Sequence, residues 1–187
     1  MADLTDLPGF IAAKDWAAAE RLLRKAARAK NPPPEVYYNL AKVLEAAGKP
    51  GQMAVWLKRA LTANPAYAFA WFELGRLALN ELRLDAAFHA FTKAHELAPG
   101  DDDSRRNLGR IALRLGKWDI ASTCFGGEND HEALLARYRI AAETGTATQA
   151  MRAELFAQPG LRKAVLKTLT RTAKGSIPLN PDHFLRK

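Results

Sequence analysis

Cysteine is almost absent from this sequence, and long hydrophobic runs are absent altogether. The 187 residues include one cysteine, Cys124, so the chain cannot form an internal disulfide or a metal site built from several thiolates. Charged residues interrupt every apolar stretch before it reaches the roughly 18 residues that a membrane-spanning helix needs. The N-terminal segment carries Asp3 and Asp6 and lacks the basic and then apolar pattern of a secretion signal. We therefore expect a cytoplasmic protein without a membrane span.

Residue groups that carry catalysis or bind metals are also scarce. His89 and His95 fall on different sides of a helix, and neither has a carboxylate or thiolate at metal-ligand spacing. Cys124 lies in an apolar stretch, so we expect a buried structural thiol. The acidic run 101–103 directly precedes a predicted helix, where carboxylates cap free backbone amides. The sequence thus predicts a protein that is not an enzyme and that uses neither a cofactor nor a metal.

The composition is that of a folded protein with its charge concentrated at one end. Hydrophobic residues make up 48% and charged residues 26%, a balance that excludes disorder throughout. The chain has room for one domain or one short repeat array. Its formal net charge is +8, of which residues 136–187 supply +7 and residues 1–135 only +1. The first three quarters of the chain are therefore not a polycation.

A period of 34 residues organises the first two thirds of the chain. Three leucines stand 34 residues apart, and a small residue follows each of them: Leu40-Ala41, Leu74-Gly75 and Leu108-Gly109. Other positions keep the same register: Ala19, Met53, Ala87 and Ala121; Leu23, Leu57, Phe91 and Phe125; Ala26, Ala60 and Ala94; Pro65 and Pro99. Such self-similarity is typical of repeat architectures.

Each repeat unit is predicted to be a helical hairpin. Apolar and small residues recur within a unit at steps of three and four, which indicates helical faces, and Gly48 or Gly116 divides the unit into two helices. Small residues such as Gly75 let helices approach closely, and Phe91 has the bulk to fill the space between neighbouring hairpins. One hairpin alone would leave its apolar stripe exposed, so the units are expected to stack.

These residues resemble the tetratricopeptide repeat family. The most similar unit reads Trp71-Phe-Glu-Leu74-Gly75, with Ala87 and Phe91 downstream and Pro99 at its end. The resemblance implies an all-α fold, a right-handed α-solenoid of helical hairpins. We place its units near residues 1–33, 34–67, 68–101 and 102–128.

The C-terminal part is predicted to be helical but out of register. Residues 129–175 form a degenerate helical hairpin followed by a capping helix, and residues 176–187 form an extended tail. The helix predicted over 161–174 places Leu161 and Val165 on one side and Lys163 and Lys167 on the other. A cap that covers the last apolar stripe is the favoured explanation of this pattern; contacts with an acidic partner, nucleic acid or an anionic membrane surface are the alternatives.

The resemblance also implies where a partner would bind, because the first helices of such repeats line a concave groove that holds a peptide or a helix. Residues in repeat register on these helices combine aromatic, amide and basic side chains: Tyr38, Asn39, Lys42, Phe72, Arg76, Arg106, Asn107 and Arg110. An acidic or aromatic peptide segment would suit them. Tyr38, Phe69 and Glu73 depart from the pattern with which the family's chaperone-binding members hold a C-terminal carboxylate, so we do not predict chaperone binding.

The predicted function is therefore a protein-binding adaptor or scaffold. One alternative is the N-terminal interaction module, or an accessory subunit, of a larger enzyme. Nucleic-acid binding through the basic C-terminal helices is a weaker alternative, because residues 136–187 hold only three aromatic residues. Self-association through uncovered solenoid ends is compatible with each of these functions.

Overall fold

The structure is a computed structural model and describes residues 4–172, which fold into helices with no strand among them. The helices, in chain order, are α1 (Leu7–Ala12), α2 (Trp16–Ala26), α3 (Pro34–Ala46), the 3-10 helix η1 (Pro50–Gln52), α4 (Met53–Ala63), α5 (Ala68–Asn80), α6 (Leu84–Leu97), α7 (Asp102–Leu115), α8 (Trp118–Phe125), α9 (His131–Thr144), α10 (Gln149–Ala157) and α11 (Arg162–Thr172). The extended tail predicted over 176–187 lies outside the described residues. Within them, no helix combines the length and the apolarity that crossing a membrane requires.

The chain forms two compact units, Met1–Ile111 and Ala112–Lys187, here called unit 1 and unit 2. The division falls within α7, inside the last of the four predicted repeat units, 102–128. The short second helix of that repeat, α8, packs against α9, so it groups with the helices that follow it.

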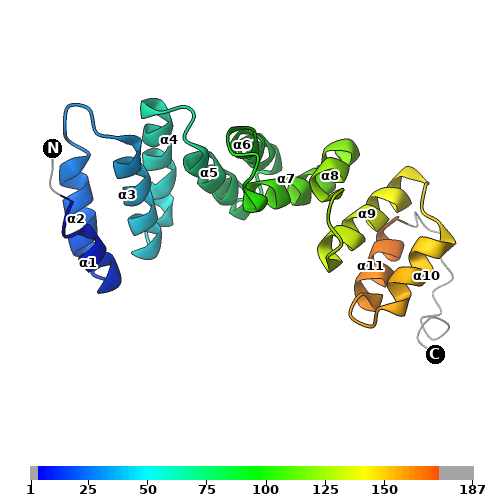
Figure 1. Ribbon diagram of the computed structural model, residues 1–187. Helices are drawn as coiled ribbons and strands as arrows, with labels where there is room; N and C mark the ends of the chain where they lie inside the picture. Colours follow the sequence, from blue (N-terminus) through cyan, green and yellow to red (C-terminus); the bar gives the residue numbers. More distant parts are fainter. Residues whose placement is uncertain (1–3, 173–187) are drawn as a thin grey trace. The chain divides into compact units, whose positions relative to one another are not determined.

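Unit 1 is a row of helices in which each packs against the next, from α1 to α6 (Figure 1). Leu23 of α2 and Leu40 and Leu44 of α3 are fully buried in one apolar cluster. Leu57 of α4 and Ala70 of α5 belong to the adjoining cluster. The apolar residues of the 34-residue register thus form the core, as the sequence predicts.

Gly75 and Phe91 show why the repeat alternates small and large residues. Phe91 of α6 is fully buried, and its ring lies directly over Gly75 of α5. A Cβ atom at Gly75 would approach the Phe91 ring to 2.8 Å, which is closer than carbon atoms pack. The helical hairpin α5–α6 therefore depends on glycine at this position.

The turn inside each hairpin repeats the same backbone conformation. Lys14, Gly48, Leu82 and Gly116, spaced 34 residues apart, have positive φ angles of 56°, 72°, 57° and 70°. At each turn, the N–H of the next residue donates to the carbonyl five positions earlier in a Schellman arrangement, at 2.8–2.9 Å: Asp15 to Phe10, Lys49 to Leu44, Arg83 to Ala78 and Lys117 to Ala112. Two of these turns therefore hold a non-glycine residue in a conformation that favours glycine.

Because the turn conformation repeats, we predict opposite changes in the free energy of unfolding for substitutions at two equivalent positions, Leu82 and Gly48. Leu82 is 76% exposed, so Leu82→Gly removes little packing and is expected to raise the free energy of unfolding by up to about 1 kcal/mol. Gly48→Leu is expected to lower it by about 1–2 kcal/mol, because a Cβ there meets no neighbouring atom and only the backbone conformation is penalised. Urea unfolding checks both, and a change of the same sign at the two positions would contradict the explanation.

Unit 2 has its own core and a basic outer side. Tyr138 of α9, Leu155 of α10, and Leu161 and Val165 at α11 are buried together. Lys163 and other basic residues of α11 are exposed on the opposite side. This arrangement agrees with the amphipathic helix predicted from the sequence and shows what its apolar side covers.

Candidate functional site

The predicted binding residues lie on the first helices of three successive hairpins, all in unit 1. Tyr38, Asn39 and Lys42 belong to α3, Phe72 and Arg76 to α5, and Arg106, Asn107 and Arg110 to α7. Arg110 is exposed and the other seven are half-buried. We call these eight residues the first-helix face.

A buried carboxylate that the prediction did not include organises the basic residues of this face. Glu73 of α5 is only 5% exposed. Lys42 Nζ donates to Glu73 Oε1 at 2.9 Å, and Arg76 donates to Glu73 Oε2. Both cations also bind Glu45 of α3, with Arg76 Nη2 at 3.2 Å from Glu45 Oε1. The four side chains carry no net charge, so Lys42 and Arg76 add no positive potential to the face.

This ion network also connects neighbouring hairpins. Burial lowers the pKa of Lys42, but hydrogen bonds to Glu45 and Glu73 outweigh it and leave the pKa raised. Burial likewise raises the pKa of Glu45, and Lys42 and Arg76 more than reverse this effect, so the pKa is lowered. Each charged state is thus stabilised by its partners, and the network holds α3 against α5.

An aromatic cluster lies beside the network. Tyr38 of α3, Tyr67 before α5 and Phe69 of α5 form a triangle with ring centroids 5.6, 6.1 and 5.8 Å apart. Tyr38 and Tyr67 are half-buried, and burial raises the pKa of both hydroxyls. Phe69 remains 64% exposed, so one ring of the cluster is open to solvent. Sequence reasoning missed Tyr67 and Phe69 as binding residues, although Phe69 stands two positions into a first helix.

A cavity of about 420 Å³ lies between α5 and α7. Its lining includes three predicted residues, Phe72, Arg76 and Asn107, together with Leu79, Asn80 and Asp103. The amide of Asn107 donates to the Asp103 carbonyl at 2.8 Å, which leaves its side-chain oxygen as an acceptor. The cavity therefore offers an apolar wall, amides and a guanidinium group to a ligand.

Other predicted residues have different surroundings. Asn39, Arg106 and Arg110 do not line this cavity. Phe72 packs its ring edge-on against Phe91, with centroids 5.7 Å apart, so it contributes to the core as well as to the surface. The structure thus brings together Phe72, Arg76 and Asn107 and separately places Tyr38 in the aromatic cluster.

The acidic run and the cysteine have structural roles. Asp101 accepts hydrogen bonds from the backbone N–H and the hydroxyl of Ser104, the former at 3.0 Å, which is the predicted capping role. Cys124 is buried. Among residues 4–172, no group of three or more histidine, cysteine, aspartate and glutamate side chains is placed to hold a metal ion.

Sequence comparison identifies one repeat directly. Residues 34–77, which span α3, α4 and most of α5, match the profile of the tetratricopeptide repeat. A search of curated protein sequences finds no significant match.

Solved structures with a similar fold cover most of the chain. A MamA structure aligns with a TM-score of 0.65 and 18% identity over 98% of this chain and 95% of its own. PilF of Pseudomonas aeruginosa aligns with a TM-score of 0.61 and 16% identity over 98% of this chain and 96% of its own. YrrB, described as a tetratricopeptide repeat protein with an unusual peptide-binding site, is 27% identical and aligns with a TM-score of 0.53 over 68% of this chain and 69% of its own. The sequence match and these alignments agree on the same helical-repeat fold.

Proposed function

Because the chain is a tetratricopeptide repeat protein, a class that generally serves as non-catalytic interaction modules, we propose that it binds an extended segment of a partner protein on the first-helix face. The observation that carries this proposal is the aromatic cluster, in which Phe69 stays 64% exposed beside two half-buried tyrosines. An exposed ring supported by other rings is a suitable anchor for an apolar or aromatic side chain.

The cavity next to the cluster supplies the polar part of the proposed site. Asn80 and Asn107 present amides that suit the backbone of an extended peptide. Leu79 and Phe72 supply apolar surface in the same cavity. A segment bound across α3, α5 and α7 would therefore find both kinds of contact.

An acidic group on the peptide would compete with Glu45 for Arg76. The Glu45 side chain is 32% exposed and lies 3.2 Å from Arg76, whereas Glu73 is buried. Displacing Glu45 from Arg76 costs less free energy than displacing Glu73, because the displaced Glu45 carboxylate can be hydrated and the buried Glu73 carboxylate cannot. We propose a ligand in which an aromatic residue supplies most of the affinity and a nearby carboxylate sets the orientation.

A peptide selection followed by affinity measurement tests this function. Random peptides displayed on phage, selected on the intact chain, are expected to be enriched in aromatic residues. The affinity of a selected peptide for Phe69→Ser is expected to fall by about tenfold or more, because the anchor loses its apolar contact. Val55→Ser, which changes another exposed apolar side chain on the second helix α4, is the matched control and should leave the affinity unchanged.

Two results would contradict the proposed function. One is a selection that yields no aromatic preference. The other is an equal loss of affinity for Phe69→Ser and Val55→Ser, which would mean that binding does not use the first-helix face.

A further inference from the structure

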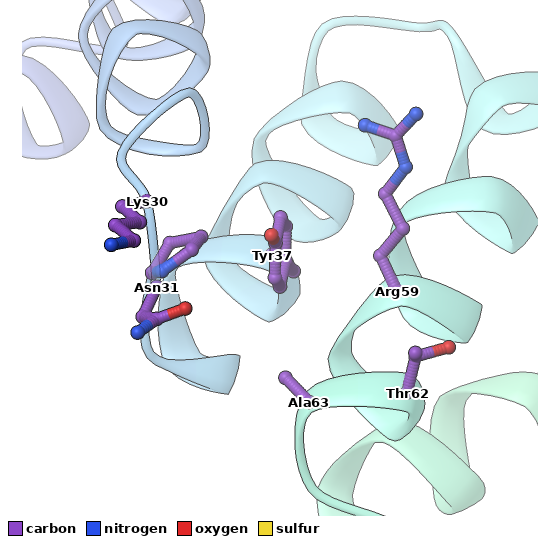
Figure 2. Close-up of a pocket in the computed structure, with 7 residues that line it drawn as sticks. Lys30, Asn31, Tyr37, Arg59, Thr62 and Ala63 are labelled. Atoms are coloured by element: carbon purple, nitrogen blue, oxygen red, sulfur yellow. The ribbon is translucent and has the colours of Figure 1, made fainter.

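A second pocket of about 540 Å³ lies at the end of the hairpin where α3 begins and α4 ends. The connection from α2 to α3 forms one wall with Lys30, Asn31 and Pro32, and the last turns of α4 form the other with Arg59 and Thr62. Tyr37 of α3 lies between the two walls (Figure 2). Tyr37 and Tyr38 are neighbours in sequence, but they face different sites because successive helical residues point about 100° apart.

The pocket is built on a rigid aromatic pair. Tyr37 stacks on Trp56 with ring centroids 6.2 Å apart and an interplanar angle of 24°. The guanidinium of Arg59 lies 4.4 Å from the centroid of the Trp56 ring, and that of Arg24 lies at 5.5 Å. Cation–π contact positions Arg59 without neutralising it.

The walls carry positive charge without matching acidic residues. The residues that line the pocket include Lys30 and Arg59 and no aspartate or glutamate. Within residues 4–172, no carboxylate forms an ion pair with Lys30 or Arg59. This is the opposite of the first-helix face, where Lys42 and Arg76 are already paired. A negatively charged ligand would therefore gain more electrostatic binding free energy at this pocket than at the first-helix face.

The connection is also preorganised. Pro32, Pro33 and Pro34 follow one another, and Pro33 is extended with φ −65° and ψ 151°. Three successive prolines restrict the backbone conformations of this wall before a ligand binds, so binding costs less conformational entropy. Asn31 and Thr62 add polar side chains on opposite walls, which suits a peptide backbone running between them.

We propose that this pocket binds an acidic segment of a partner protein, with successive aspartate or glutamate side chains placed between Lys30 and Arg59. A peptide fits the pocket better than nucleic acid does. Tyr37 is half-buried and one face of its ring packs against Trp56, so the pocket has no open ring pair for stacking bases. Its volume also exceeds what one phosphate group fills.

Titration with a short acidic peptide tests the proposal. The probe is acetyl-Gly-Glu-Glu-Glu-Glu-Gly-amide, the matched probe has glutamine in place of glutamate, and oligothymidine of similar charge is the nucleic-acid comparison. The acidic peptide is expected to bind and to shift the NMR signal of the Trp56 indole N–H, and the glutamine peptide is expected not to. Lys30→Gln with Arg59→Gln should weaken binding by about tenfold or more.

The control removes the same charge elsewhere. Arg83→Gln with Lys93→Gln changes two cations of unit 1 that do not line the pocket, and it should weaken binding by less than about threefold. Equal weakening by both double variants would overturn the proposal, because binding would follow net charge only. Tighter binding of oligothymidine than of the acidic peptide would overturn it in favour of nucleic acid. Phe69→Ser should leave acidic-peptide binding unchanged, so this site and the first-helix face succeed or fail independently.

Discussion

Replacing Phe91 by alanine is expected to lower the free energy of unfolding of unit 1 by about 3–5 kcal/mol. Phe91 is fully buried and packs against Gly75 and the edge of Phe72. Its removal leaves a cavity that the backbone of α5 cannot fill, because a glycine faces it. The effect is large because one ring fills the space between two helices.

Urea unfolding followed by tryptophan fluorescence measures this effect. Trp118→Phe provides a useful background, because the three remaining tryptophans, Trp16, Trp56 and Trp71, all lie in unit 1. Phe69→Ala is the matched control and should lower the free energy of unfolding by only about 1 kcal/mol, because Phe69 is 64% exposed and loses only its contacts with Tyr38 and Tyr67. Similar losses for Phe91→Ala and Phe69→Ala would show that the contact over Gly75 does not stabilise the hairpin.

Removing both cations that face Glu73 is expected to destabilise unit 1 by about 3–5 kcal/mol. In Lys42→Met with Arg76→Met, the side chains keep most of their length but leave the Glu73 carboxylate buried without a partner. A buried charge without compensation is costly, whereas the intact network satisfies it.

A compensating substitution distinguishes this cause from a loss of packing. Adding Glu73→Leu to the double variant removes the unpaired charge and is expected to restore most of the lost stability. Arg83→Met with Lys93→Met removes two exposed ion pairs and should cost less than about 1 kcal/mol in total. If the triple variant is no more stable than the double variant, the charge of Glu73 is not the source of the loss.

The hairpin fold was predictable from the sequence because it depends on local and periodic information. Apolar spacing within a helix and small residues such as Gly75 recur at 34-residue intervals, and each recurrence confirms the others. The contact between Gly75 and Phe91 explains why one position of the repeat holds a small residue and another holds a large one. Leu82 shows a limit, since its positive φ follows from its place in the repeat and not from its residue type.

The site was less predictable because its chemistry depends on pairs of side chains from different hairpins. The sequence placed Lys42 and Arg76 on first helices and suggested a basic stripe, but Glu45 and Glu73 neutralise both. The sequence did contain a signal for these pairs. Lys42 and Glu73 are 31 residues apart, and so are Glu45 and Arg76. This separation is the length of one repeat minus about one helical turn. Opposite charges at this spacing in a 34-residue repeat indicate contacts between neighbouring first helices.

The division into two units and the basic pocket depended on tertiary packing alone. The register continues to Phe125 and is lost after it, but no local pattern shows that α8 packs against α9. Arg137 illustrates this dependence: its guanidinium donates to the Phe125 carbonyl at 3.0 Å and so satisfies the end of α8. Lys30 and Arg59 likewise belong to different hairpins, and only the fold places them around Tyr37.

The most direct test of the first-helix face is to map where a selected aromatic peptide contacts the intact chain. Backbone amide NMR signals of the labelled protein are followed while the peptide is added. Binding at the face predicts the largest shifts at Tyr38, at residues 67–76 and at Asn107, with little change along α4 and α6. The largest shifts on α4 and α6, with none at Phe69, would contradict the account.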